Sequence, residues 1–214
     1  MKVLLTSGAT REPIDAVRFV SNISSGATGA ALADALAAAG HEVTLLHGEG
    51  AVRPCRDGVV CGVFGSTAHL GERLRSTLAG GTYAVVIQAA AVSDYRPDTE
   101  HAGKLSSQVE ELALRLVPTP KLLPLIKGWS PRPVRVLGFK LTHGADDVTR
   151  AAAVARLFAS GGVDAVVHND LLEMNTTGAG RTFRIYGSGE AVALANFAGV
   201  PALCDWVAGW VAGG

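Results

Sequence analysis

Apolar segments of strand length alternate with helical repeats over most of the chain, and this alternation restricts the fold more than any other feature. Residues 42–47 and 83–87 are apolar on both faces, as strands buried inside a parallel sheet are. Between them Leu70, Leu74 and Leu78 recur with the spacing of one helix face. The alternation predicts an α/β fold: a doubly wound, Rossmann-like, mostly parallel sheet with helices on both faces.

The same reading gives approximate bounds for each element. Strands are expected over residues 2–7, 42–47, 57–64, 83–87, 111–117, 134–139 and 164–168. Helices are expected over residues 25–39, from Ser66 or Thr67 to 78, over 121–127 and over 148–158. Ligands of doubly wound sheets bind beyond the carboxyl ends of the strands, so the loops that follow these strands are the candidate site.

The C-terminal part of the chain has a different pattern. Residues 181–186 alternate as a strand, a glycine-rich turn follows, and residues 190–194 return, which predicts a β-hairpin. Pro201 is expected to start a final helix that carries Trp206 and Trp210. We therefore expect a single domain over residues 1–214, with the hairpin and terminal helix (181–212) as an appendage.

Composition excludes several classes of function. Lys plus Arg and Asp plus Glu both number 19, so bulk charge favours neither nucleic acid nor a membrane surface as partner. Cys55, Cys61 and Cys204 are too scattered for a disulfide framework. Apolar runs fall short of the roughly 18–20 residues of a membrane span. Met1 leads directly into a strand, without a signal peptide, so we expect a soluble, cytoplasmic protein.

A long polar loop separates the first strand from the first helix. It runs from Gly8 to Asp15 and on through Ser21–Gly29, and it opens into an Ala/Leu-rich helix. A strand, a Gly/Ser-rich loop and a helix N-terminus direct backbone N–H groups at an anion. The alternative is that Gly26 and Gly29 serve only close packing of the helix on the sheet.

This loop carries a recognisable motif. The run T-R-E-P-I-D-A-V-R-F-V-S-N-I-S-S-G resembles the opening signature of phosphopantothenoylcysteine synthetases, the ligases of coenzyme A biosynthesis. The resemblance implies that Asn22 is catalytic and that Gly8 lies at the nucleotide. It implies substrate contacts for Arg18, Ser24, Ser25 and Gly26. Read without the family, an Asn in such a loop is usually a turn residue.

Further segments resemble the same family in the expected order, up to about residue 170. They are A-A-A-V-S-D-Y-R-P from Ala89, G-K-L-S-S from Gly103, V-P-T-P-K-L-L from Val117, G-F-K-L from Gly138 and H-N-D from His168. The resemblance assigns Lys104 to catalysis. It assigns the nucleotide to Ala89, Ala90, Asp94, Pro120, Lys121, Leu122 and Phe139. The plain alternatives are a turn aspartate at Asp94, a core residue at Phe139 and a solvated charge at Lys104.

The chain departs from the family pattern at several charged positions. Ser106 and Ser107 stand where the family has lysines, and Lys121 stands where it has Asp. Leu157 and Gly161 occupy the places of two lysines that hold the triphosphate in many bacterial members. Candidates to replace those lysines are Lys140, Arg150 and Arg156.

The resemblance also implies a reaction. Members join 4′-phosphopantothenate to L-cysteine through an acyl-nucleotide, using a nucleoside triphosphate and Mg²⁺. We expect CTP rather than ATP, with metal ligands that the sequence does not identify. We expect residues 96–110 to form a mobile loop over the site, which closes to bring Lys104 to the polyphosphate. Because nothing of the size of a flavin-dependent decarboxylase precedes the first strand, we expect a stand-alone synthetase without flavin. Family members are homodimers; the hairpin and the Trp206/Trp210 helix are candidate interfaces.

Two other functions stay open. A nicotinamide-dependent oxidoreductase has the same fold, and Glu49 after the second strand is placed to hold a ribose. Against it, Gly8-Ala9-Thr10-Arg11 is not Gly-x-Gly-x-x-Gly, and a Tyr-x-x-x-Lys pair is missing. The other alternative is a nucleotide-binding regulator without activity, which the departures at Ser106, Ser107, Leu157 and Gly161 support.

Overall fold

The computed structural model describes residues 1–108, 110–176, 181–190 and 192–213. An eight-stranded sheet forms its centre, in the order β12-β11-β10-β9-β6-β1-β4-β5. These strands are β1 Lys2–Ser7, β4 Glu42–Gly48, β5 Val60–Phe64, β6 Val85–Gln88, β9 Arg135–Thr142, β10 Ala165–Asp170, β11 Thr182–Gly187 and β12 Ala195–Ala198. The first six pair in parallel, while β11 and β12 are antiparallel. The predicted doubly wound, mostly parallel sheet is confirmed.

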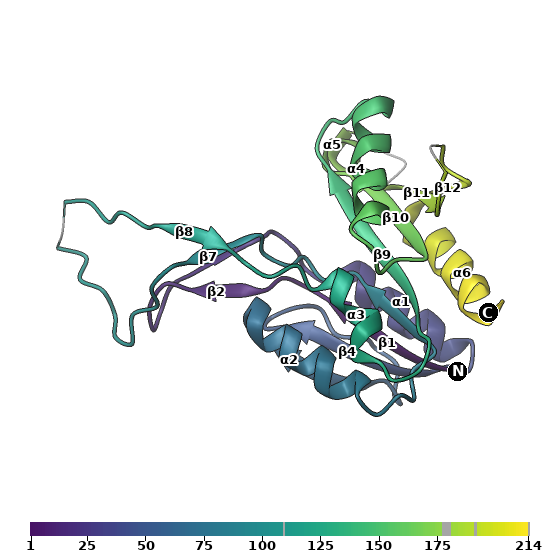
Figure 1. Cartoon of the computed structure of the whole chain (residues 1–214), viewed down its shortest axis with the longest axis horizontal. Coiled ribbons are helices and arrows are strands. Elements are labelled where there is room, and N and C mark those ends of the chain that lie inside the picture. The colour runs from purple at the N-terminus through teal and green to yellow at the C-terminus, as the bar shows by residue number, and fades with distance from the viewer. Residues whose placement is uncertain (109, 177–180, 191, 214) are drawn as a thin grey trace.

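Helices cover both faces of the sheet (Figure 1). They are α1 Ala27–Ala38, α2 Thr67–Leu78, α3 Ile126–Trp129, α4 Asp147–Ala159, α5 Leu171–Thr176 and α6 Gly199–Ala212, with a 3₁₀ turn at Leu123–Leu125. Helices α1 and α6 share one apolar core with alternate side chains of the strands. Helices α2, α3 and α4 share the core on the other face. None of the helices within the described residues is long and apolar enough to cross a membrane.

Two predicted strands differ from the structure. The alternation of Leu112, Leu114 and Leu116 predicted a strand over 111–117, but β8 covers Leu116–Pro118 alone, and all three leucines are at least 40% exposed. A period-two pattern forms a strand only where a neighbouring edge is available, and here β8 pairs with the short β7, Tyr95–Pro97. The first strand after helix α1 is also followed by a shorter partner, since β5 starts at Val60 rather than 57.

The C-terminal hairpin continues the main sheet. The return strand, expected over 190–194, is instead β12, because the turn is longer and pairing begins where Leu194 N–H donates to the Ile185 carbonyl (2.7 Å). Residue 191 lies outside the described residues. The division into one domain with an appendage stays a prediction, although β11 and β12 extend the same sheet as the parallel strands.

Helix α6 packs against α1, so its apolar face is used within the chain. Leu203, Val207 and Val211 are fully buried in the core that α1 shares. Trp206 and Trp210 are partly buried and stack on each other, with ring centroids 6.2 Å apart. The choice of this helix or the hairpin as a dimer interface stays a prediction.

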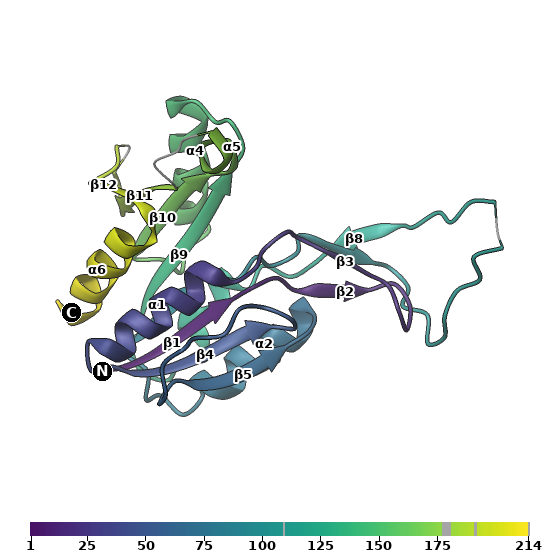
Figure 2. The ribbon, with the colours of Figure 1, turned by 180° about the vertical axis from the view of Figure 1, so that it is seen from behind.

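The signature loop contains a hairpin that sequence analysis did not predict. Its strands are β2 Arg11–Pro13 and β3 Phe19–Ser21. Together with β7 and β8 they form an arm that projects beyond the sheet, with residues 98–108 and 110–115 at its outer end (Figures 1 and 2). We call this projection the arm.

Buried side chains of the signature tie the arm to the body. The Thr10 hydroxyl accepts the backbone N–H of Ser93 (2.9 Å), which joins the loop after β1 to the loop after β6. The buried Glu12 carboxylate accepts both the backbone N–H and the hydroxyl of Thr67 (2.9 and 2.7 Å). It therefore caps the start of α2 alongside the predicted cap Ser66, whose hydroxyl accepts from the His69 N–H (3.3 Å).

Candidate functional site

A cleft of about 980 Å³ opens beyond the carboxyl ends of β1, β6, β9 and β10. This is the edge of a doubly wound sheet where ligands bind. It is lined by residues 22–29, 88–94, 121–124 and 139–141, and by Ala153, Arg156, Leu157, Ser160, Asn169, Leu171, Arg181 and Phe183. Ten of the predicted site residues are among them: Asn22, Ser24, Ser25, Gly26, Ala89, Ala90, Asp94, Lys121, Leu122 and Phe139.

The N-terminus of α1 forms one end of the cleft. Gly26 takes the left-handed conformation at the N-cap (φ 77°) and offers no side-chain cap to the first turn. A Cβ on Gly29 would lie 2.3 Å from the Ser7 Cβ, so glycine there lets the helix lie close against β1. Both readings of the two glycines therefore hold: Gly29 serves packing, and the uncapped first turn faces the cleft as an anion site.

Arg181 strengthens that anion site and was missed by sequence analysis. Its guanidinium donates to the Thr28 hydroxyl in the first turn of α1 (2.9 Å), across 153 positions of sequence. It reaches this place because β11 returns antiparallel beside β10. The sequence pattern marked Arg181 only as the start of a strand.

The loop after β6 forms the floor of the cleft. The Ala91 N–H donates to the Gly8 carbonyl (2.8 Å), which fixes Ala89 and Ala90 beneath the opening. Gly8 itself does not line the cleft but supports this loop from behind. Gln88, a second residue that sequence analysis missed, accepts from the Thr6 hydroxyl (3.0 Å). Its buried Nε2 has no hydrogen-bond partner among the described residues.

Asn22 lies at the rim of the cleft. Its side chain is exposed, and its amide donates to the Val92 carbonyl (3.1 Å) at the end of the β6 loop. The Ser21 hydroxyl donates to the Asn22 backbone carbonyl (3.1 Å) and to the Thr10 carbonyl (2.7 Å). These contacts hold the amide next to the small residues Ala89 and Ala90, where an acyl group would lie.

Asp94 and Lys121 form an ion pair across the cleft mouth. Two backbone contacts support it, because the Thr119 hydroxyl donates to the Ser93 carbonyl and the Thr119 N–H donates to the Asp94 carbonyl (3.0 Å). Lys121, which replaces the Asp of the family pattern, is thus paired with Asp94. Pro120 is exposed and does not line the cleft.

Three further cations face the cleft: Lys140, Arg156 and Arg181. Lys140 and Arg156 were candidates to replace the family's triphosphate lysines, and they lie on the same side as Leu157. Arg150, the third candidate, is instead bound to the Asp147 carboxylate (2.6 Å) and to the Ala145 carbonyl (3.3 Å).

The two departures on α4 are not equivalent. Leu157 lines the cleft, partly buried against the apolar core. Gly161 follows the end of α4 with φ 79° and does not line the cleft. A side chain at that position would be strained, because residues other than glycine rarely adopt positive φ.

Arg18 and Lys104 lie on the arm rather than in the cleft. Arg18 pairs with Asp15 (2.8 Å), and its guanidinium also donates to the Leu105 carbonyl (3.4 Å). Lys104 is exposed beside it. Residues 96–110 do not line the cleft of their own chain, so the expectation that they cover the site is wrong for the single chain. The loop is held outward by its hydrogen bonds to the signature hairpin.

A buried polar network lies behind the cleft at the ends of β9 and β10. The Asp170 carboxylate accepts from the Thr142 hydroxyl (2.6 Å) and from the N–H groups of Gly144 (2.7 Å) and Ala145 (3.0 Å). Burial alone would raise the pKa of Asp170, but these hydrogen bonds outweigh it and hold the pKa well below its usual range.

His168 belongs to the same network and is fully buried. Because the Thr142 hydroxyl gives its proton to Asp170, it accepts one from His168 Nε2 (2.8 Å). Burial, followed by the positive charges of Arg150 and Arg184, lowers the pKa of His168 to about 4. The imidazole is therefore neutral at physiological pH.

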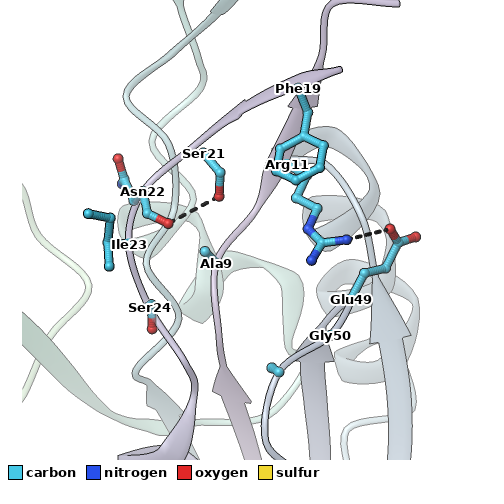
Figure 3. Close-up of a pocket in the computed structure, with 10 residues that line it drawn as sticks. Ala9, Arg11, Phe19, Ser21, Asn22, Ile23, Ser24, Glu49 and Gly50 are labelled. Carbon is cyan, nitrogen blue, oxygen red and sulfur yellow. Dashed lines mark hydrogen bonds and ion pairs between the residues drawn. The ribbon is translucent and has the colours of Figure 1, made fainter. Parts of the chain in front are cut away.

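A smaller pocket of about 280 Å³ adjoins the cleft (Figure 3). Its walls are Ala9, Arg11, Phe19, residues 21–24 and residues 49–51. Asn22, Ile23 and Ser24 line both cavities. Glu49, which an oxidoreductase would need for a ribose, faces Arg11 here at 3.6 Å. We call this cavity the small pocket.

The described residues contain no cluster of three His, Cys, Asp or Glu side chains that would hold a metal by themselves. Asp94 brings one carboxylate to the cleft. Mg²⁺ that arrives on a nucleotide is typically held by phosphate oxygens, waters and one or two carboxylates. The residues present fit an ion of that kind.

Comparisons with known proteins agree with this site. Residues 1–186 match the family described as DNA/pantothenate metabolism flavoprotein C-terminal domain. The chain is 36% identical over 170 residues to the coenzyme A biosynthesis bifunctional protein CoaBC of Thermococcus kodakarensis, which covers 79% of this chain and 41% of that protein. The chain thus spans less than half of that relative.

Solved structures share the fold. The DNA/pantothenate metabolism flavoprotein from Streptococcus pneumoniae superposes with a TM-score of 0.87 at 24% identity, covering 100% of this chain and 99% of that one. A Cab2 variant in complex with phosphopantothenate-cysteine superposes with a TM-score of 0.73 at 18% identity, covering 98% and 88%. The resemblance to phosphopantothenoylcysteine synthetases is confirmed, and the chain belongs to the family of DNA/pantothenate metabolism flavoprotein C-terminal domains.

Proposed function

We propose that this chain joins 4′-phosphopantothenate to L-cysteine through an acyl-nucleotide, in coenzyme A biosynthesis. One observation carries the proposal: an uncapped helix N-terminus, the cations Lys140, Arg156 and Arg181, and the Asn22 amide all border one cleft. That combination suits a triphosphate beside an acyl group. The names of the CoaBC relative and of the Cab2 complex support the same substrates.

The first step activates a carboxylate, which is a poor electrophile. A carboxylate oxygen of phosphopantothenate attacks the α-phosphorus of the nucleotide, a new P–O bond forms, and pyrophosphate leaves. Two anions must meet, so the positive groups of the cleft lower the barrier by offsetting their repulsion. Mg²⁺ on the triphosphate supplies further positive charge, with Asp94 as its ligand from the protein.

The second step transfers the acyl group to cysteine. The amine forms a C–N bond to the acyl carbon, the C–O bond to the nucleotide phosphate breaks, and the nucleoside monophosphate leaves. Negative charge develops on the acyl oxygen as the amine attacks. Asn22 is the side chain that we assign to this oxygen, since its amide lies at the rim and is held through Val92 and Ser21.

We propose CTP as the nucleotide, as in the bacterial pattern that the sequence follows. Backbone groups of residues 89–91 and 121–123 border the cleft and are available to pair with the edge of a base. A wrong base leaves such buried groups unsatisfied, at about 1–3 kcal/mol each. Phe139 lies on the apolar side of the cleft, where a base would stack.

The arm favours a homodimer in which two copies complete each other's site. Arg18 and Lys104 are held together at the outer part of the arm, away from the cleft of their own chain. In a two-fold dimer, the arm of one copy is long enough to cover the cleft of the other (Figure 1). Lys104 would then act on a polyphosphate bound by its partner.

Mixing two inactive variants tests this arrangement. Asn22→Asp removes a cleft group and Lys104→Gln removes an arm group, so a mixed dimer retains one intact composite site. Activity of the mixture should rise to about a quarter of wild type if sites are composite, because half of the dimers are mixed and each has one working site. No recovery on mixing would place Lys104 and Asn22 in the same chain's site.

A coupled assay for pyrophosphate release tests the proposed ligase itself. Release should require both the nucleotide and 4′-phosphopantothenate, and cysteine should then yield phosphopantothenoylcysteine, detectable by mass spectrometry. A nicotinamide-dependent reaction would instead produce an absorbance change without pyrophosphate. Nucleotide binding without pyrophosphate release would identify a regulator and contradict the ligase.

A further inference from the structure

The small pocket carries two opposite charges that the steps above do not use. Arg11 Nη1 and Glu49 Oε2 face each other at 3.6 Å, which exceeds hydrogen-bond range. Figure 3 shows the guanidinium and the carboxylate at one side of the pocket, with Asn22 at the other. Their side chains are 36% and 56% exposed. Both charged groups are therefore open to a ligand that brings its own opposite charges.

The backbone fixes the positions of both charges. The Arg11 N–H donates to the Gly65 carbonyl (2.9 Å), and the Glu49 N–H donates to the neighbouring Phe64 carbonyl (3.1 Å). The Arg11 guanidinium also lies over the Phe19 ring, 4.7 Å from its centroid. Stacking orders the planar guanidinium and leaves its edge free for bidentate contact with a carboxylate.

The size and place of the pocket restrict the ligand. A volume of about 280 Å³ suits a molecule of amino-acid size rather than a nucleotide. Asn22 and Ser24 line both cavities, so a ligand in the small pocket lies next to an acyl group in the cleft. The small side chains of Ala9 and Ala51 complete the walls.

We propose that the small pocket binds the zwitterionic amino-acid substrate, L-cysteine, between Arg11 and Glu49. Arg11 holds the α-carboxylate and Glu49 holds the α-ammonium group. Identifying the ligand as cysteine rests on the proposed ligase. Before attack the ammonium gives one proton to the Glu49 carboxylate, which passes it to solvent; the second proton leaves as the amine nitrogen becomes an amide.

The test uses two variants and a matched control. Arg11→Gln and Glu49→Gln each remove one charge, while Glu42→Gln breaks the exposed Lys2–Glu42 pair (3.7 Å) at the opposite end of β1 and β4. Arg11→Gln and Glu49→Gln should raise the KM for cysteine about 10- to 100-fold, as expected for losing a hydrogen bond to a charged group. Pyrophosphate release and the KM for phosphopantothenate should not change. Glu42→Gln should behave as wild type.

Cysteamine, which lacks the carboxylate, separates a binding role from a structural one. Arg11→Gln should leave the KM for cysteamine unchanged, whereas Glu49→Gln should raise it. An equal rise of both KM values in Arg11→Gln would show a general distortion and overturn the proposal. So would an unchanged cysteine KM in both variants.

Direct binding distinguishes this inference from the ligase proposal. Titration of the isotope-labelled chain with L-cysteine should shift the amide resonances of Ala9, Gly50 and Ala51, and the shifts should vanish in Arg11→Gln. Cysteine binding there without pyrophosphate release would uphold the pocket and overturn the ligase. Ligation without these shifts, at an unaltered cysteine KM, would do the reverse.

Discussion

The Asp15 carboxylate accepts the backbone N–H of Leu105 at 3.0 Å, which joins two segments that are 90 positions apart in the sequence. The same carboxylate accepts the N–H groups of Val17 (2.9 Å) and Arg18 (2.8 Å). The Val17 hydrogen bond is the largest cause that lowers the pKa of Asp15 below its ordinary 3.8. This one side chain therefore shapes the hairpin turn and holds the Lys104 loop against it.

Replacing Asp15 with Asn should detach the Lys104 loop. The amide supplies one acceptor oxygen in place of two, so at least one of the bonds to Arg18 and Leu105 is lost. Pyrophosphate release should fall at least tenfold relative to wild type (an estimate of about 1.4 kcal/mol, one charged hydrogen bond). Wild-type release and proteolysis rates at residues 101–105 would contradict it. Because the pKa is lowered, the contribution of the carboxylate is present above pH 3.8 and is lost below it.

Asn22→Asp should slow the second step by roughly 10²–10³, because a donor to the developing acyl oxygen becomes an acceptor. The acyl-nucleotide would then accumulate, and mass spectrometry of the quenched reaction would detect it. Ser24→Ala, a change at another residue that lines both cavities, is the comparison. Unchanged turnover in Asn22→Asp would remove this residue from the mechanism.

Lys104→Gln should suppress pyrophosphate release with little change in thermal stability, as expected for an exposed side chain on the arm. Lys127, which pairs with Asp164 at 2.7 Å away from the cleft, provides a matched control as Lys127→Gln. A large drop in melting temperature for Lys104→Gln would indicate a structural lysine. Normal pyrophosphate release would leave Lys104 without a role in the first step.

The nucleotide preference should favour CTP, with a high KM for the nucleotide. Leu157→Lys should lower that KM, because position 157 lines the cleft next to Arg156. Gly161→Lys should not help, since Gly161 has φ 79° and does not line the cleft. Measuring kcat/KM for CTP and ATP in the three proteins checks both points. A preference for ATP would show that the base pocket departs from the bacterial pattern.

Stability should fall as the pH drops from about 6.5 to 4, because His168 is neutral in the folded chain. Its pKa is lowered from 6.5 to about 4, so the unfolded state binds the additional proton in this window. A protonated Nδ1 would be a buried donor that lacks an acceptor among the described residues. The cost reaches about 3 kcal/mol at pH 4. Urea unfolding of His168→Gln should show a flatter pH dependence, whereas the exposed control His143→Gln should match wild type.

Local patterns were enough to predict the parallel strands, most helices and the segments that form the cleft. Buried parallel strands must be apolar on both faces, and helices must repeat their apolar residues at helical spacing, so both leave a signal in a short window. The signature also identified Asn22, Ser24 and Gly26, because a strand, a polar loop and a helix are consecutive in the chain. Ten of the predicted site residues line one cleft for this reason.

Tertiary structure alone decided what meets across long separations. Arg181 reaches Thr28 because β11 returns beside β10, and Arg11 meets Glu49 because β1 and β4 are neighbours in the sheet. The arm carries Lys104 outward because Asp15 binds Leu105, a contact that no periodicity encodes. Charged side chains on loops leave no hydrophobic pattern, so their partners follow from strand order and hydrogen bonding rather than from the local sequence.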